Sequence, residues 1–169
     1  MSAPSVNETI AGNVCFGCGL SNSAGLGVEV FRDPEHPGRL LGRFEARPEQ
    51  AGFPGITHGG ALYTALDCMA TWSGMLLGGT RALWVLRSAS MRYLRPALAG
   101  RPLDLAAEIE KAGGPWEPIG VRCEARDADG VLLARGSFDV VPLPPEKFLA
   151  ITGLSELPEG WARWLAGED

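Results

Sequence analysis

Asp67 is the only formal charge between Glu49 and Arg81, and it lies in a run of apolar and small residues. That run predicts a helix from about Gly59 to Leu77 that is buried on nearly all sides. A carboxylate there must be paired, be neutralised, or face a cavity, because an uncompensated buried charge is very costly. Asp67 is therefore a candidate general base or attacking carboxylate. The alternative is a structural carboxylate that holds a loop.

The residues before and after Asp67 supply further candidates. His58, Gly59 and Gly60 precede the helix, and the free N–H groups of a helix start suit a developing oxyanion. We assign that role first to Gly60 and second to Gly59. We expect His58 to orient a carbonyl or water, or to hold the loop, rather than to transfer protons. Thr71, one turn after Asp67, either positions water or substrate or bonds to its own helix backbone.

The spacing of Gly60 and Asp67 limits how they can cooperate. Seven residues along one helix correspond to about 10 Å, at roughly 1.5 Å per residue. That separation is too large for both groups to act on one carbonyl. We therefore predict a site that combines the helix start of one chain with Asp67 of another.

Composition restricts the partners and the location. The net charge of −5 and the pI near 5.1 argue against a nucleic-acid partner. Residues 1–10 lack the basic start and apolar core of a secretory signal. The apolar run at residues 59–80 contains five glycines and Asp67. It also lacks the aromatic and basic residues that flank a membrane-spanning helix, so we expect no membrane span. A cytoplasmic protein is the expectation.

Two of the four cysteines form a Cys-x-x-Cys pair, Cys15 and Cys18. One pair supplies two ligands, whereas a structural zinc ion usually takes four, and neither histidine lies at zinc-finger spacing. We predict a tight glycine-flanked turn without metal, with a zinc ion shared across a dimer as the alternative. Cys68 and Cys123 are expected to pack in the core.

The order of elements predicts an α+β fold. Two strand-like runs precede the helix, and four runs with period-two alternation follow it. The predicted strands are residues 26–32, 39–46, 83–94, 103–110, 119–126 and 131–141. We expect a curved antiparallel sheet of about six strands around the helix, within a domain at 26–142. An irregular segment at 1–25 and an extension at 143–169 flank it. One sheet cannot cover every side of the helix, which predicts a dimer.

Three local patterns carry a resemblance to a known family. They are His58-Gly59-Gly60 with Asp67 nine positions after the histidine, Met91-Arg92-Tyr93-Leu94-Arg95-Pro96, and Cys15-Phe16-Gly17-Cys18-Gly19 with Asn22 and Gly25-Leu26. Together they resemble the hotdog-fold acyl-CoA thioesterases, in the branch of the phenylacetate-pathway and 4-hydroxybenzoyl-CoA thioesterases. The resemblance implies a hotdog fold, a homodimer or a dimer of dimers, and thioester hydrolysis at the subunit interface. It implies no metal and no cofactor, because coenzyme A is part of the substrate.

The chain departs from this family at Leu86, where a threonine usually lies ten residues before the proline. We expect any assisting hydroxyl to come from Ser88 on the same strand face, or from Thr71. Two other functions remain open: an acyl-thioester hydratase or dehydratase, whose usual histidine-proline motif is not matched, and a non-catalytic acyl-CoA binder.

Five arginines and no acidic residue occur within residues 81–101. Guanidinium groups suit phosphate oxygens, so we assign Arg92 and Arg95 to the phosphates of coenzyme A. The alternative is that these arginines are solvated strand ends.

Overall fold

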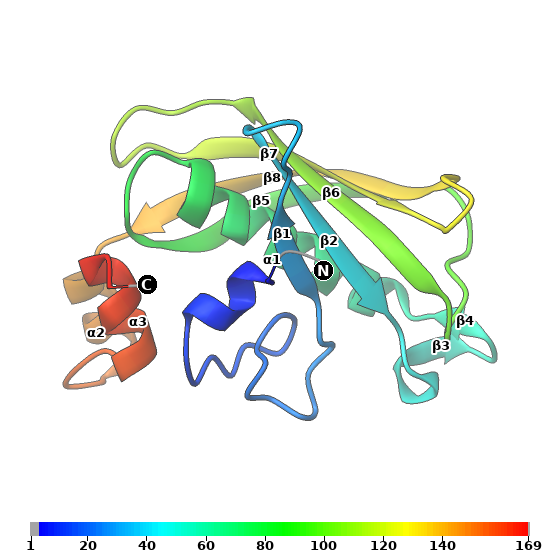
Figure 1. Cartoon of the computed structure of the whole chain (residues 1–169), viewed down its shortest axis with the longest axis horizontal. Helices are drawn as coiled ribbons and strands as arrows, with labels where there is room; N and C mark the ends of the chain where they lie inside the picture. The colour runs from blue at the N-terminus through cyan, green and yellow to red at the C-terminus, as the bar shows by residue number, and fades with distance from the viewer. Residues whose placement is uncertain (1–3, 169) are drawn as a thin grey trace.

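The computed structural model describes residues 4–168, and Figure 1 shows a curved sheet lying over one long helix. The elements in chain order are η1 (Val6–Thr9), β1 (Glu29–Arg32), β2 (Arg39–Glu45), η2 (Pro48–Gln50), β3 (Ala51–Phe53), β4 (Ile56–Thr57), α1 (Gly59–Leu77), β5 (Leu83–Tyr93), β6 (Pro102–Lys111), β7 (Ile119–Arg126), β8 (Leu132–Leu143), α2 (Pro145–Thr152) and α3 (Glu159–Ala166).

Six strands form one antiparallel sheet in the order β1-β2-β6-β7-β8-β5. In β7 every second residue is buried, from Ile119 to Ala125, because successive side chains of a strand point to opposite faces. The buried face of the sheet packs on α1, and the other face is exposed to solvent. The predicted α+β class, with a six-stranded antiparallel sheet around one helix, is confirmed.

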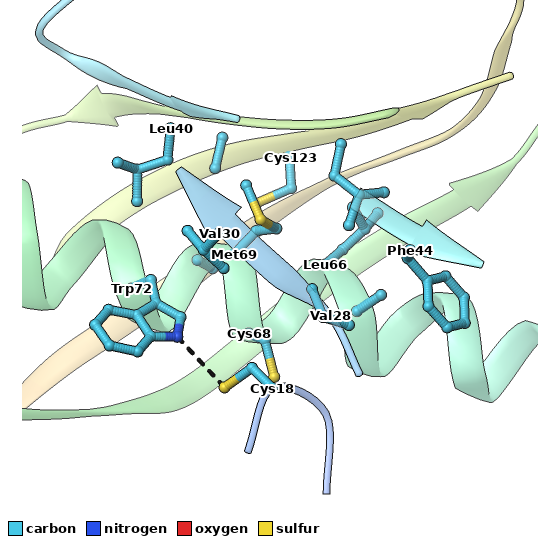
Figure 2. Close-up of a cluster of buried hydrophobic side chains, with 14 of the residues drawn as sticks. Cys18, Val28, Val30, Leu40, Phe44, Leu66, Cys68, Met69, Trp72 and Cys123 are labelled. Atoms are coloured by element: carbon cyan, nitrogen blue, oxygen red, sulfur yellow. Dashed lines mark hydrogen bonds between the residues drawn. The ribbon is translucent and has the colours of Figure 1, made fainter. Parts of the chain in front are cut away.

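Helix α1 forms the centre of the core. Figure 2 shows Leu66 and Met69 of α1 beneath Val30 and Leu40 of the sheet. Each of these side chains is almost completely buried, and full burial of such a side chain contributes about 1.5–3 kcal/mol. Gly42 of β2 lies directly over Met69, where an added Cβ would come within 2.5 Å of the Met69 sulfur. A glycine there allows β2 to approach the helix closely.

The chain ends pack on each other. Asn7 is buried, its amide donates to the carbonyls of Cys18 and Val28, and its Oδ1 accepts from Val30 N–H at 2.8 Å. Gly160 of α3 packs against Ala11, and in Figure 1 the C-terminal helices lie beside the N-terminal segment. The segment around Asn7 is thereby held against β1, and α3 is held against the N-terminal segment.

The N-terminal segment also covers part of α1. At Gly17 an added Cβ would meet Cys68 Sγ at 2.3 Å and Thr64 at 3.1 Å. The surface of α1 that the rest of the fold leaves uncovered is therefore smaller than the sheet alone would leave. No helix within residues 4–168 is long and apolar enough to cross a membrane.

Candidate active site

Helix α1 begins with an unusual cap. His58 is the N-cap, and its Nδ1 accepts from the Gly60 N–H at 2.9 Å. Because Nδ1 accepts, the proton of a neutral ring is assigned to Nε2. The N–H groups of Ala61 and Leu62 donate to the His58 carbonyl. Within residues 4–168 the Gly59 N–H has no acceptor. Of the two predicted oxyanion donors, Gly59 is thus the one with an open N–H.

A pocket of about 530 Å³ opens at this helix start. Its lining includes Phe53, His58, Gly59, Leu62, Tyr93 and Arg95. The Tyr93 hydroxyl donates to the Gly59 carbonyl at 2.9 Å, which fixes the strand end of β5 against the first turn of α1. The pocket is largely apolar, and its lining also includes the hydrogen-bonding residues Thr57, His58 and Arg95, which is the usual composition of a small-molecule site.

Asp67 lies two turns further along α1 and does not line this pocket. Its Oδ1 is buried and has no hydrogen-bond partner in the part of the chain that the structure describes. Burial, followed by the Coulombic effect of Cys15, raises the pKa of Asp67 to about 6, although a hydrogen bond from Thr71 acts in the opposite direction. Thr71 thus lies beside Asp67, and the carboxylate keeps an unused acceptor in a poorly solvated place.

The predicted face of Ser88 is wrong. Leu86 pairs with Val140, but after a β-bulge Ser88 pairs with Asp139, the neighbouring residue of β8. Adjacent residues of a strand face opposite sides, so the bulge turns Ser88 to the outer face of the sheet. There its hydroxyl donates to Asp139 Oδ2 at 2.9 Å. Among the two hydroxyls predicted to assist, only Thr71 lies on the helix with Asp67.

The two arginines predicted to bind phosphate, Arg92 and Arg95, line different pockets. Arg92 pairs with Arg135, and both line a small pocket with Glu110 and Arg122. Arg95 instead lines the pocket at the helix start and a second pocket of about 620 Å³. Within one chain, therefore, these arginines do not form the single phosphate site that we predicted.

Sequence reasoning did not assign a role to Tyr93, which lines the pocket at the start of α1. The signal was present, because Tyr93 lies in the segment Met91–Pro96 that carries part of the family resemblance. Its contact with Gly59 joins residues 34 positions apart, and local patterns carry no information about such a contact.

Replacing His58 by Ala is expected to lower the free energy of unfolding by about 1 kcal/mol, the usual cost of losing an N-cap hydrogen bond. Asn is among the strongest N-cap residues, so His58→Asn should retain the stability of the wild type. Urea unfolding of the three proteins measures this. Equal losses in both variants would contradict a capping role for the ring.

We next compared the chain with known protein families and structures. The family model of the thioesterase superfamily matches residues 54–134, which contain the helix start and Asp67. No curated protein sequence matches the chain.

Solved structures are similar over most of the sheet and helix. The PaaI protein of the E. coli phenylacetic acid degradation operon has 18% identity and a TM-score of 0.60, covering 70% of this chain and 80% of that one. AziG of S. sahachiroi has 26% identity and a TM-score of 0.62, covering 70% and 93%. A hypothetical thioesterase of Streptococcus pneumoniae TIGR4, solved with coenzyme A, has 18% identity and a TM-score of 0.59, covering 69% and 86%. The chain therefore has the hotdog fold, and its residues 54–134 match the family model of the thioesterase superfamily.

Proposed function

We propose that the protein is an acyl-CoA thioesterase. The observation that carries this proposal is the open N–H of Gly59, a residue at the start of α1 that lines a largely apolar pocket. The thioesterase superfamily match and the likeness to a protein solved with coenzyme A support it. No cofactor is needed in this proposal, since coenzyme A is part of the substrate, and we expect a cytoplasmic enzyme.

In the proposed reaction the thioester carbonyl accepts hydrogen bonds from Gly59 N–H and His58 Nε2–H. The positive end of the α1 dipole then stabilises the oxyanion that forms. Asp67 either removes a proton from water as the water attacks the carbonyl carbon, or attacks that carbon itself. When Asp67 acts as the base, the proton that it took from water passes to the coenzyme A thiolate as the C–S bond breaks. When Asp67 attacks, the thiolate leaves as a mixed anhydride forms, and the water that then hydrolyses the anhydride supplies the proton. Thr71 positions the water.

We assign the two halves of the site to two chains of a homodimer. Asp67 does not line the pocket at its own helix start, and Gly59 and Asp67 lie about 12 Å apart along α1, at roughly 1.5 Å per residue. Strand β5 ends the sheet, and most of its residues from Val85 to Tyr93 are exposed. A long open edge offers unpaired backbone groups to another chain. A dimer through this edge would bring the partner's α1 near the pocket.

Complementation tests this assignment. Asp67→Asn and Gly59→Pro homodimers are each expected to be nearly inactive. If they are unfolded, mixed and refolded, half of the dimers are hybrids, and each hybrid has one intact site. We expect the mixture to recover about a quarter of wild-type activity. If each site were built from a single chain, no hybrid would contain an intact site, and the mixture would stay inactive.

Arg95 is expected to contact the phosphates of the substrate. Arg95→Glu should raise KM for an acyl-CoA by about tenfold, since a charge-assisted hydrogen bond is lost and repulsion replaces it. KM for a simple aryl thioester, which has no phosphate, should change little. Arg92→Glu is the matched control from the other pocket and should affect the two substrates equally. A similar loss for both substrates in Arg95→Glu would contradict the contact.

The function itself is tested by a panel of aryl, short-chain and long-chain acyl-CoAs, with thiol release as the readout. Turnover of at least one substrate is the expected result. A change in the absorbance of an enoyl-CoA without thiol release would identify a hydratase instead. Tight binding without turnover would identify a non-catalytic acyl-CoA binder.

A further inference from the structure

Three cysteines meet on the side of α1 that the N-terminal segment covers. The Sγ atoms of Cys15, Cys18 and Cys68 all lie within 4.8 Å of one another, and those of Cys15 and Cys68 are 3.9 Å apart. Figure 2 shows Cys18 and Cys68 side by side, with Cys123 apart from them toward the sheet. All four cysteines are free thiols. Cys68 is therefore not only a core residue, because the fold adds it to the Cys-x-x-Cys pair.

The chain holds this cluster with specific contacts. The Gly19 N–H donates to the Cys15 carbonyl at 2.9 Å and closes the turn between the two cysteines. Asn13 Oδ1 accepts from the Cys15 N–H at 3.0 Å. Only a glycine fits at position 17, because a Cβ there would lie 2.3 Å from Cys68 Sγ. The turn thus packs directly on α1 and places the thiols of Cys15 and Cys18 next to that of Cys68.

The spacing matches the geometry of a thiolate-bound metal. A tetrahedral zinc ion with Zn–S bonds of about 2.3 Å places its sulfur ligands roughly 3.8 Å apart. Three thiolates this close would repel one another strongly, and a bound dication would offset that repulsion. The indole N–H of Trp72 donates to Cys18 Sγ at 3.3 Å, the kind of outer hydrogen bond that orients a metal ligand.

We propose that Cys15, Cys18 and Cys68 bind one zinc ion per chain. Within residues 4–168 no histidine or carboxylate belongs to the same cluster. The fourth position is then filled by water on the side of Cys15, the exposed member of the three. Binding replaces the thiol protons, so up to three protons leave as one zinc ion enters. The ion ties the N-terminal segment to α1, and this inference does not depend on the proposed activity.

The test uses the full chain, reduced and freed of metal with a chelator, and titrated with Zn²⁺ alone. We expect one zinc ion per chain, measured by elemental analysis after desalting, together with proton release. Cobalt in place of zinc should give sulfur-to-metal charge-transfer absorption. Cys15→Ser should weaken zinc binding by at least about 100-fold, since loss of an outer-shell partner alone costs 10- to 100-fold.

Cys123→Ala is the matched control, because it removes the one cysteine outside the cluster and should keep full zinc binding. Cys15→Ser is the preferred variant because Cys15 is exposed, so its replacement does not disturb the core. Cys68→Ser is the second variant and should bind as weakly as Cys15→Ser. Failure of the reduced wild type to take up zinc, or undiminished uptake by Cys15→Ser, would overturn the proposal.

Discussion

Replacing Asp67 by Asn is expected to lower kcat for the best acyl-CoA substrate by about 100- to 10,000-fold, the usual contribution of a positioned base. Asn has nearly the same shape but neither accepts a proton from water nor attacks a carbonyl carbon. KM should change little, because the side chain acts on the reacting bond rather than on coenzyme A. Steady-state thiol release gives both constants.

The fold should tolerate this change. Asp67 Oδ1 makes no hydrogen bond within residues 4–168, and the amide oxygen of Asn can still accept the hydrogen bond from Thr71. The substitution therefore removes a buried charge without costing the fold a hydrogen bond. We therefore expect the melting temperature of Asp67→Asn to be unchanged and its kcat to be strongly reduced. A folded Asp67→Asn protein with wild-type kcat would leave Asp67 as a structural carboxylate.

The role of Asp67 divides further into base and nucleophile. A single turnover in water labelled with heavy oxygen separates them. Label that enters the Asp67 carboxylate indicates attack by Asp67 itself, followed by hydrolysis of a mixed anhydride. Label that enters only the released acid is expected of general-base catalysis and also of an anhydride that water opens at its acyl carbon, so label in Asp67 is the decisive result.

Gly59→Pro is expected to lower kcat by about 100- to 1000-fold, the usual cost of losing one oxyanion donor. Proline has no N–H, yet it is well suited to the first position of a helix. His58 before it has ψ 132°, the extended conformation that a residue before proline requires. The substitution should thus delete the donor and keep the helix.

Gly59→Ala is the matched control, since alanine retains the N–H. Its Cβ would lie 3.4 Å from the Tyr93 ring, an ordinary contact. Circular dichroism and thermal unfolding check that both variants fold. Equal rates for the proline and alanine variants would show that the Gly59 N–H does not bind the oxyanion.

The local pattern of the sequence predicted the elements well. The helix runs from Gly59 to Leu77 as expected, and β7 has the predicted bounds. The reason is that these elements follow from hydrophobic periodicity and from glycines at the helix ends, which are properties of neighbouring residues. The solvent-exposed and buried faces of β6 and β7 follow from the alternation of polar and apolar residues along each strand.

Other features depend on tertiary contacts. One extra residue in β5 reverses the face of Ser88, and strand pairing alone shows it. The His58 ring occupies the Gly60 N–H and leaves that of Gly59 open. The sequence by itself therefore determined the helix, the strands and the candidate carboxylate. Only the tertiary structure decided which donor is open and which thiols meet, because Cys15 and Cys68 are 53 residues apart and come together only when the chain folds.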